Sequence, residues 1–575
     1  MPDASTKPTT SSEPPRPRGL LAVKEGLTSI VIAFALAFVF RGFVLEAFLI
    51  PTGSMAPTLL GQHHRFIGPN SGYQFTTGPW VGQGDVQVRD PMVDTLMQSR
   101  RADTPRLAGD RIFVLKYLPP IYRPKRWDVS VFKYPPGPTT NYIKRMIGLP
   151  NEQVALIDGD VFVRPAPPSA EPGTLADGGL TPPDTWNTEG WTIARKPERV
   201  QRAVWQDVWD SRFAPPPAES TGVRFRQPWQ AGAASEADRS AWEVSGESVY
   251  RYTGASNAAL VWDADARPFT DRTAYNQTGA RIAPPYPVSD IATLMAIEPE
   301  GASLGVVEVG LSTRRHGFRA ILQDGAARLE IRDAEGDGDW QTLATGELPD
   351  GALQPGRVTP VEFWHHDQRL TLWVDGRQIA QGDYDWTPVQ RVRQTFGIDL
   401  TDQATLDAID VRRGASQDKH PFAYPSAPTS PRLQWTFGAG EPAESGGGRG
   451  AGAGFTIHRS VVKRDLHYQA GVYTANQDTR GVHSRQLEPF LATHPCQTPT
   501  LGPDQFVLLG DNSPASADAR MWDHPSPWVA DQVDDTIGVV HRDLLIGRAF
   551  IVYFPAPHPG GSLPVPDAGR VRWIF

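Results

Sequence analysis

Cysteine is nearly absent from this chain of 575 residues, in which Cys496 is the only one. A single cysteine cannot form a disulfide within the chain, and it cannot supply the thiolates of a cysteine-rich zinc site. Disulfides therefore give no information about the compartment in which the protein works.

A marked excess of positive charge is also lacking. The chain has 56 lysine and arginine residues against 64 aspartate and glutamate residues, which gives a net charge of −8. It contains no stripe in which basic and aromatic residues are interleaved. We therefore expect no nucleic acid partner.

Long hydrophobic runs are equally scarce, and only residues 26–40 form an uncharged apolar stretch of membrane character. These residues would span about 22 Å as a helix, which is short of the roughly 30 Å hydrocarbon core of a bilayer. A transmembrane anchor over residues 19–45 closes the gap if Lys24 and Arg41 extend to the headgroups. Residues 1–18, rich in Pro, Ser and Thr, predict a disordered tail.

The orientation of the anchor follows from the basic residues that precede it, which are Lys7, Arg16, Arg18 and Lys24. The positive-inside rule predicts a cytoplasmic N-terminus, so that the rest of the chain faces the outside of the cell membrane. The alternative is a cleavable secretion signal cut after Ala35-Leu36-Ala37. Because the apolar run continues past that site to Phe40, we favour an uncleaved, single-pass anchor.

Three segments behind the anchor carry side chains suited to catalysis. Ser54 follows Pro-Thr-Gly, and Lys144 lies in the apolar, strand-like segment 141–152. Burial would lower the pKa of Lys144, and a neutral amine can accept the proton of a serine hydroxyl. Residues 510–522 are dense in Asp, Asn and Ser, as a hydrogen-bonded loop would be. Taken singly, the three segments could equally be a turn, a surface lysine and a structural loop.

Taken together and in this order, the segments resemble the type I signal peptidases, which are membrane proteases with a Ser–Lys pair. The matching motifs are Pro-Thr-Gly-Ser-Met-Ala-Pro-Thr-Leu (51–59), Gly-Asp-Arg-Ile-Phe-Val-Leu-Lys (109–116), Tyr-Ile-Lys-Arg-Met-Ile-Gly-Leu-Pro (142–150) and Gly-Asp-Asn-Ser (510–513). The resemblance covers residues 20–164 and 456–575.

The resemblance implies a role for each of these side chains. Ser54 would be the nucleophile and Lys144 the general base, while the Thr52 hydroxyl and the Ser54 backbone amide would hold the oxyanion. Ser516 would hydrogen-bond the lysine amine and orient it. The residues expected to support the site are Asp511, Asp518, Arg520 and Arg145. This chemistry needs no metal and no organic cofactor, so we expect neither.

Three positions depart from the usual pattern of that family. Asn151 and Asp523 stand where glycine is usual, and Ala519 stands where serine is usual. None of them removes a group that touches the proposed reaction, so we interpret all three as loop adjustments.

Two insertions interrupt the resemblance. In the first, residues 61–108, an abundance of Gly, Arg and Asp predicts loops and short strands. Its segment 68–73 looks like a zinc-ribbon turn without cysteines. His63 and His64 alone make a poor metal site, so we interpret them as solvated loop residues and assign no metal.

The second insertion is larger and divides into three parts. Residues 165–245 predict a linker and an irregular segment, 246–437 a β-sandwich, and 438–454 a Gly-rich linker. The catalytic domain would then consist of residues 46–164 and 455–575. We therefore expect a mainly β protein, with an all-β catalytic domain behind one transmembrane helix, interrupted by a jelly-roll-like sandwich.

Alternating apolar residues support this sandwich and predict strands at 316–323, 328–333, 359–365, 368–374 and 405–413. Asp375-Gly376 predicts a tight hairpin turn. The segment 363–376 looks like concanavalin-like (laminin-G-like) domains, which often bind glycans or proteins, although a fold does not fix a function. Trp364 and Trp373 could stack on sugars, but we favour burial in the core.

The function that the resemblance implies is removal of signal peptides from exported precursor proteins, at the outer face of the membrane. One alternative is a Ser–Lys protease with another membrane-associated substrate. The other is an anchored protein whose sandwich binds a glycan or a protein while the protease core is inactive. The presence of Ser54, Lys144 and Ser516 together favours an active enzyme.

Overall fold

The computed structural model describes most of the chain, namely residues 18–80, 84–100, 103–117, 122–166, 186, 189–217, 225–232, 241–253, 258–278, 285–300, 305–333, 338–397, 399–402, 404, 428–438, 454–468, 500–522, 524–556 and 567–575. Several features expected from the sequence lie outside these residues, wholly or almost wholly. They are the N-terminal tail, the Gly-rich linker, the strand at 405–413, Cys496 and Asp523.

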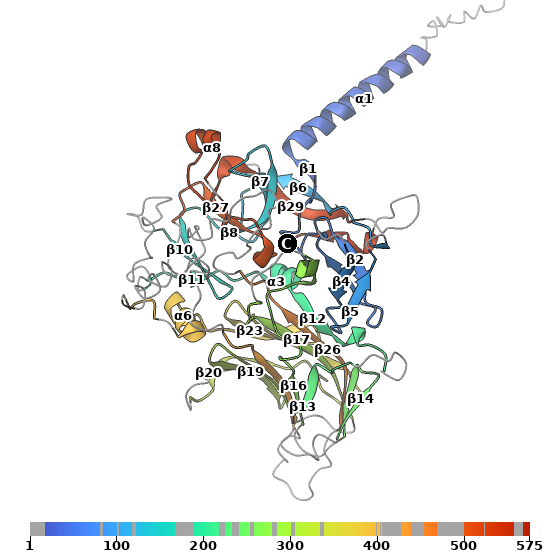
Figure 1. Ribbon diagram of the computed structural model, residues 1–575, viewed down its shortest axis with the longest axis vertical. Coiled ribbons are helices and arrows are strands. Elements are labelled where there is room, and N and C mark those ends of the chain that lie inside the picture. The colour runs from blue at the N-terminus through green and yellow to red at the C-terminus, as the bar shows by residue number, and fades with distance from the viewer. Residues whose placement is uncertain are drawn as a thin grey trace, which may run out of the picture.

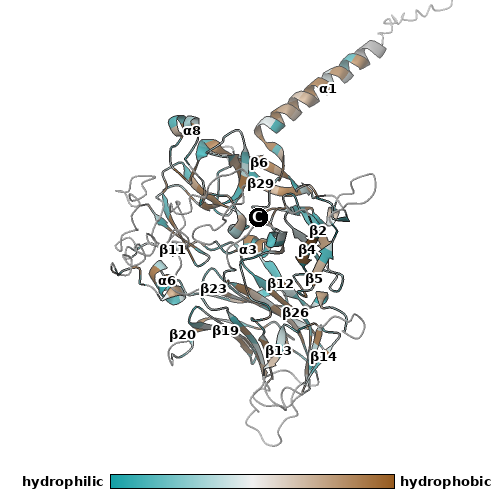
Figure 2. Ribbon diagram, in the orientation of Figure 1, coloured by the Kyte–Doolittle hydropathy of each residue, from teal (hydrophilic) through white to brown (hydrophobic). Residues whose placement is uncertain are grey.

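Helix α1 (Arg18–Phe43) projects away from the rest of the protein (Figure 1). Its segment Val23–Phe43 has a mean hydropathy of 1.9, and none of it is buried against the protein. The helix is accordingly brown over most of its length in Figure 2. By length and composition α1 can cross a membrane, because 21 helical residues reach about 31 Å.

An antiparallel sheet of eight strands follows α1, in the order β1-β6-β29-β7-β8-β27-β28, and β30 pairs with β29. Neighbouring strands come from both ends of the sequence, so this sheet is complete only when the chain returns from the second insertion. Its strands are β1 (Leu45–Leu49), β6 (Arg111–Lys116), β7 (Val129–Lys133), β8 (Asn141–Gly148), β27 (Gln505–Leu509), β28 (Val540–His541), β29 (Leu545–Phe554) and β30 (Arg572–Trp573).

The first insertion forms two hairpins, β2–β3 (His64–Ile67 and Gln74–Thr77) and β4–β5 (Val86–Arg89 and Leu96–Ser99). At its zinc-ribbon-like turn, the Ser71 hydroxyl donates to the Asp90 carboxylate over 2.5 Å. The expectation of solvated histidines was wrong, because His63 and His64 are both buried. Burial lowers the pKa of His63 to about 4, and its Nδ1 lies 2.8 Å from the Gly61 carbonyl oxygen.

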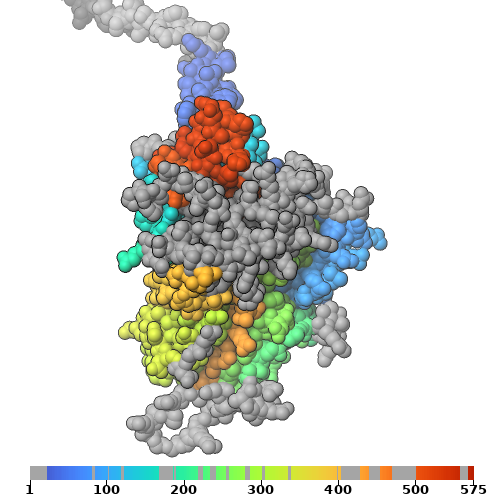
Figure 3. All heavy atoms as spheres, turned by 60° about the vertical axis from the view of Figure 1, so that its left-hand side comes forward, coloured from blue at the N-terminus to red at the C-terminus, as the bar shows by residue number. Residues whose placement is uncertain are grey.

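Two antiparallel sheets form the β-sandwich at the end of the molecule opposite α1 (Figures 1 and 3). The sheets enclose a common core that includes Trp209, Phe363 and Trp435. One sheet consists of β12 (Gln206–Asp210), β14 (Trp242–Ser245), β15 (Val249–Tyr252), β17 (Ile291–Pro299), β22 (Thr359–His366), β23 (Arg369–Val374), β24 (Arg377–Asp383) and β26 (Phe455–Arg464). The other consists of β13 (Trp229–Gly232), β16 (Ala258–Trp262), β18 (Val306–Thr313), β19 (His316–Gln323), β20 (Ala326–Asp333), β21 (Gln341–Glu347) and β25 (Arg432–Gly438).

The sandwich is larger than the sequence indicates. Strands β12, β13 and β14 belong to it, although their residues were expected to be irregular. Strand β26 also belongs to it, although we expected the catalytic domain to resume at residue 455. The reason is long-range pairing: β26 pairs with β17 from Ile291 to Pro299, and alternating apolar residues do not reveal which sheet a strand joins.

Local patterns inside the sandwich gave better predictions. Strands β19, β22 and β23 lie within a residue or two of their expected bounds. The β23–β24 turn has positive φ angles of 51° at Asp375 and 72° at Gly376, as a two-residue hairpin turn requires. Trp364 and Trp373 are 1% and 7% exposed and pack against Trp205, so their burial is confirmed.

A small sheet of three strands is separate from the eight-stranded sheet. Its strands are β9 (Glu152–Ile157), β10 (Asp160–Pro165) and β11 (Thr192–Ile193). The remaining helices and 3-10 turns are short. They are α3 (Glu198–Val204), α6 (Pro388–Phe396), α8 (Pro527–Gln532), η2 (Ser211–Phe213), η3 (Ala274–Thr278), η4 (Ser513–Ala515), η5 (Arg542–Leu544) and η6 (Ala568–Arg570).

Buried ion pairs join the small sheet to the sandwich. Asp158, at the β9–β10 turn, accepts hydrogen bonds from Arg314 over 2.7 and 2.9 Å and lies 3.0 Å from Arg391. Burial opposes ionisation of Asp158, but the two arginines outweigh it and lower its pKa well below the usual range. A buried carboxylate held by two cations fixes the junction between the two units.

Candidate active site

Ser54 and Lys144 meet beside β8, an interior strand of the eight-stranded sheet. Ser54 lies in the loop between β1 and β2, and Lys144 lies on β8. Lys144 Nζ is 2.7 Å from Ser54 Oγ and donates a second hydrogen bond to the Ile143 carbonyl over 3.1 Å. Two side chains far apart in the sequence thus form a hydroxyl–amine pair.

Burial changes the acidity of this amine. Lys144 is only 2% exposed, and desolvation lowers its pKa from 10.5 to about 8, although Asp518 and Asp511 act in the opposite direction. An amine with such a pKa is partly neutral near physiological pH, and it can accept a proton from a hydroxyl within hydrogen-bond reach.

The Gly-Asp-Asn-Ser loop is held by a buried ion pair with β8. Arg145 donates from Nε and Nη2 to the two oxygens of Asp511, over 2.8 and 2.7 Å, and both side chains are fully buried. Tyr468 donates a further hydrogen bond to Asp511 over 3.2 Å. Because Arg145 follows Lys144 directly, this pair fixes the strand position that carries the lysine.

A second buried pair holds the end of the same loop. Arg520 donates from Nε and Nη2 to Asp518 over 2.8 and 2.6 Å, and its Nη1 donates to the Ser513 hydroxyl over 2.8 Å. Asp518 also accepts from the Gly510 amide over 2.9 Å. Burial alone would raise the pKa of Asp518, but Arg520 outweighs it, so the carboxylate stays ionised.

Ser516 lies where expected but does not make the expected hydrogen bond. Its hydroxyl is buried, and it has no hydrogen-bond partner among the described residues. The Lys144 amine is directed instead to Ser54 and to the Ile143 carbonyl. The packing here is tight, since a Cβ at Gly510 would lie 2.1 Å from Ser516 Oγ. Thr52 is exposed beside Ser54.

Asn512 is a residue whose role the sequence analysis missed. Its backbone amide donates to the Ser54 carbonyl over 3.0 Å, and its Nδ2 donates to the Gly53 carbonyl over 3.1 Å. The side chain is 1% exposed. Its place in the Gly-Asp-Asn-Ser motif was visible in the sequence, but the partner loop was not.

The unusual residues near the site have structural explanations. Asn151 adopts a left-handed conformation with φ of 61°, which glycine and asparagine tolerate better than most residues. Ala519 is fully buried in the core beside Trp522. Neither residue reaches Ser54 or Lys144.

Among the described residues, one group has the spacing of metal ligands. Asp160, Asp290 and Asp367 are buried, with carboxylate oxygens within 4.8 Å of one another. Lys196 and Arg391 already contact this group, at 2.5 Å from Asp367 and 3.2 Å from Asp160. These cations compensate the carboxylates in the way a metal ion would, and the group lies at the sandwich junction.

Comparison with known proteins agrees with this geometry. Residues 23–173 match the family described as "Signal peptidase, peptidase S26". This segment of the chain therefore resembles the S26 signal peptidases. The match includes Ser54, Lys144 and α1 from Val23 onward.

Two curated relatives show how far the similarity to signal peptidases extends. Signal peptidase I of Pseudomonas aeruginosa is 32% identical over 162 residues, which cover 27% of this chain and 44% of the relative. Signal peptidase I of Rickettsia typhi is 29% identical over 141 residues, which cover 24% of this chain and 43% of the relative. The chain thus spans less than half the length of either relative.

Solved structures match other parts of the chain only weakly. A carbohydrate-binding module from Bacillus subtilis is 8% identical and covers 42% of this chain and 96% of its own, with a TM-score of 0.22. The laminarinase from Rhodothermus marinus is 9% identical and covers 46% and 98%, with a TM-score of 0.25. At such scores the likeness carries no argument, and the sandwich rests on its own two sheets.

Proposed function

We propose that this protein is a membrane-anchored signal peptidase that cleaves precursor proteins with a Ser54–Lys144 pair. The observation that carries the proposal is the 2.7 Å distance between the Nζ of the buried Lys144 and the Oγ of the half-buried Ser54. The S26 match over residues 23–173 gives independent support.

In the proposed reaction, neutral Lys144 takes the proton of the Ser54 hydroxyl while the oxygen attacks the scissile carbonyl carbon. The Ser54 amide and the Thr52 hydroxyl bind the oxyanion, and such preorganised donors lower the barrier by several kcal/mol. Lysine then returns the proton to the leaving amine, which gives an acyl-enzyme. Water, deprotonated by the same lysine, hydrolyses the ester. Ser516 is the residue proposed to orient the amine once Ser54 is acylated.

The proposed location follows from α1. Basic residues before the helix favour a cytoplasmic N-terminus, which places Ser54 close to the outer surface of the cell membrane. Ser54 follows the end of α1 by only eleven residues, five of which form β1. Substrates would therefore be cut where a membrane-inserted signal peptide leaves the lipid. A glycan or protein ligand of the sandwich remains a separate proposal.

Cleavage of a precursor with a small-x-small site, by the full-length protein in detergent, tests this function. We expect wild type to cut after the second small residue, and Ser54→Ala and Lys144→Ala each to lower the rate at least 1,000-fold. Lys133→Ala is the matched control, because Lys133 is an exposed lysine on the neighbouring strand β7.

Retention of cleavage by Ser54→Ala would exclude Ser54 as the nucleophile. Failure of folded wild type to cut any such precursor would instead favour another membrane-associated substrate or an inactive protease core. Equal loss in Lys133→Ala would show that the assay reports a general disturbance of the sheet rather than the Ser–Lys pair.

A further inference from the structure

A short turn from the sandwich reaches the loop that carries Ser54. This turn, η3, lies in the connection between strands β16 and β17 and therefore belongs to the inserted unit. It contacts the serine loop, the Gly-Asp-Asn-Ser loop and the hairpins of the first insertion. None of its residues belongs to the four motifs that resemble signal peptidases, so its position next to Ser54 is a property of this insertion.

Tyr275 of η3 packs directly on the serine loop. A Cβ built on Gly53 would lie 1.9 Å from Tyr275 Cε1, so only glycine allows the ring to come this close to the neighbour of Ser54. The Tyr275 hydroxyl donates to the Gln62 carbonyl over 2.6 Å, at the far end of the same loop. The ring also packs with Ala56 and Leu60 in one buried cluster.

Asn276 of η3 links the two loops of the site. Its side chain and that of Asn512 exchange two hydrogen bonds, each of 2.9 Å. Asn512 in turn donates to the carbonyl oxygens of Gly53 and Ser54. The chain of contacts from the insertion to the nucleophile is therefore Asn276, Asn512 and then the Ser54 backbone.

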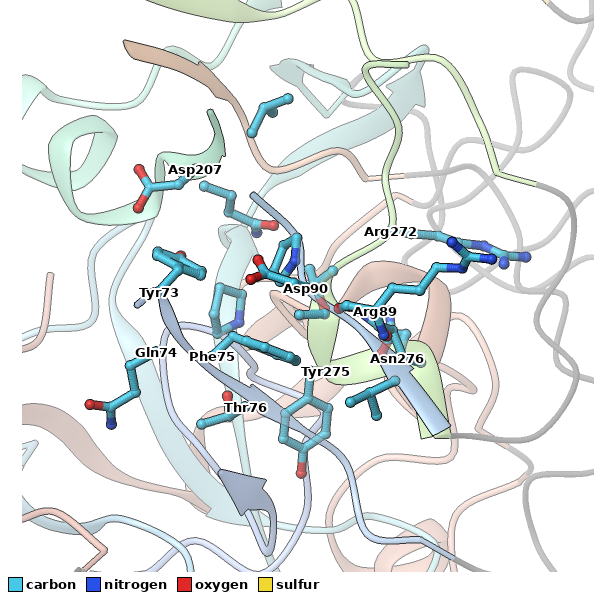
Figure 4. A pocket seen from close by; sticks show the side chains of 18 of the residues that line it. Tyr73, Gln74, Phe75, Thr76, Arg89, Asp90, Asp207, Arg272, Tyr275 and Asn276 are labelled. Carbon is cyan, nitrogen blue, oxygen red and sulfur yellow. The ribbon is translucent and has the colours of Figure 1, made fainter. Parts of the chain in front are cut away.

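Residues of η3 also border a cavity. Tyr275 and Asn276 line a cavity of about 1220 Å³, which hairpin residues such as Phe75 and Arg89 also line (Figure 4). Gln277 holds η3 to the hairpins through two hydrogen bonds with the Arg89 backbone, over 2.6 and 2.9 Å. Thr278 and Tyr275 add hydrogen bonds with the backbone of Gly78, so specific contacts with the first insertion fix the position of η3.

We infer that Tyr275 and Asn276 are positioning residues, through which the inserted sandwich holds the Ser54 loop in its reactive geometry. The inference rests on the proposed function. A hydroxyl that must lie within about 3 Å of both amine and carbonyl carbon is sensitive to small shifts, and a displacement of 1 Å can cost about 100-fold in rate. Among the described residues, neither side chain is hydrogen-bonded to the Ser54 hydroxyl or to the Lys144 amine.

Kinetics and hydrogen exchange of full-length Asn276→Ala, Asn276→Asp and Tyr275→Phe test the inference. Asn276→Ala loses both bonds to Asn512, so we expect kcat to fall about 10- to 100-fold with KM changed less than about twofold. Asn276→Asp keeps an acceptor for Asn512 but cannot donate to its oxygen, so its loss should be smaller. Tyr275→Phe loses only the bond to Gln62 and should be the mildest variant.

Deuterium exchange at the amides of Ala56 and Asn512 gives a readout that does not depend on cleavage. These amides donate to Gly53 and Ser54, so they should exchange faster in Asn276→Ala and stay protected in Gln434→Ala. Gln434 is the control because it is an exposed amide of the sandwich, hydrogen-bonded only within β25.

The outcomes separate the two proposals. Unchanged exchange and unchanged kcat in Asn276→Ala would overturn the positioning role. If wild type cleaves no precursor, the proposed function fails, but exchange at Ala56 and Asn512 still decides whether η3 holds the loop. If Asn276→Ala does not fold, the graded series of Asn276→Asp and Tyr275→Phe gives the same answer, and a flat series would contradict the inference.

Discussion

The pH dependence of acylation gives the sharpest test of the Lys144 environment. Burial lowers the pKa of Lys144 to about 8, and only its neutral form can accept the Ser54 proton. At pH 7 about 9% of such a side chain is neutral, against about 0.03% for an ordinary lysine. The buried position thus raises the concentration of active base by about 300-fold.

The pKa of Lys144 can be read from the shape of the plot of acylation rate against pH. With a pKa of about 8, the single-turnover acylation rate should rise about tenfold between pH 7 and pH 9 and level off above pH 8. A lysine of ordinary pKa would give a rise of about 100-fold over the same range with no plateau. Stopped reactions with excess detergent-solubilised protein over a precursor measure this rate without interference from product release.

The reasoning would be refuted by a rate that keeps rising tenfold per pH unit up to pH 9.5. A flat profile from pH 6 to pH 9 would refute it as well, because the base would then not titrate in this range. Repeating the profile with Lys133→Ala controls for titration of surface groups on the same sheet.

Three further predictions concern the same site. Lys144→Met should raise the free energy of unfolding at pH 7 by about 1–3 kcal/mol, measured by denaturant titration. The reason is that the pKa of Lys144 is lower in the folded state than in the unfolded state, so the charged side chain destabilises the fold at pH 7, and this loss is recovered only as the pH rises from 8 to 10.5. Arg145→Ala should lower that free energy by about 3–5 kcal/mol, since Asp511 loses its buried partner; a loss below 1 kcal/mol would contradict this. Gly53→Ala should lower the rate of precursor cleavage at least tenfold, because the added methyl group clashes with Tyr275. The double variant with Tyr275→Ala should recover part of the rate. No recovery would show that the loss in Gly53→Ala does not come from this clash.

Local sequence patterns predicted the parts of the fold that depend on near neighbours. Strands β22 and β23 were readable from alternating apolar residues, and the Asp375-Gly376 turn from its need for positive φ. In contrast, Phe455–Arg464 joins the sandwich because it pairs with Ile291–Pro299. No local pattern in the sequence predicts which distant strand it pairs with. The burial of His63 and His64 was missed for the same reason, because the segments that cover them are distant in sequence.

The site shows the same division between local and long-range information. Ser54, Lys144 and the acidic loop could be found from their motifs, and the structure brings Ser54 and Lys144 within hydrogen-bond distance. That the Ser516 hydroxyl has no hydrogen-bond partner among the described residues could not be inferred, because a motif gives residue types but not side-chain directions. Tyr275 and Asn276 lie outside every motif, and only the folded chain reveals their contacts with Gly53 and Asn512.

The position of the second insertion explains why it does not disrupt the eight-stranded sheet that carries Lys144. The insertion leaves after β10 and returns before β27, and the sandwich lies opposite α1, so it need not enter the membrane surface (Figures 1 and 3). Its junction is not loose, because Asp158 binds Arg314 and Arg391 in a fully buried contact. A flexibly tethered domain could not hold η3 against the serine loop. The ionic junction and η3 therefore join the sandwich to the rest of the protein at two points, and η3 is the point that contacts the Ser54 loop.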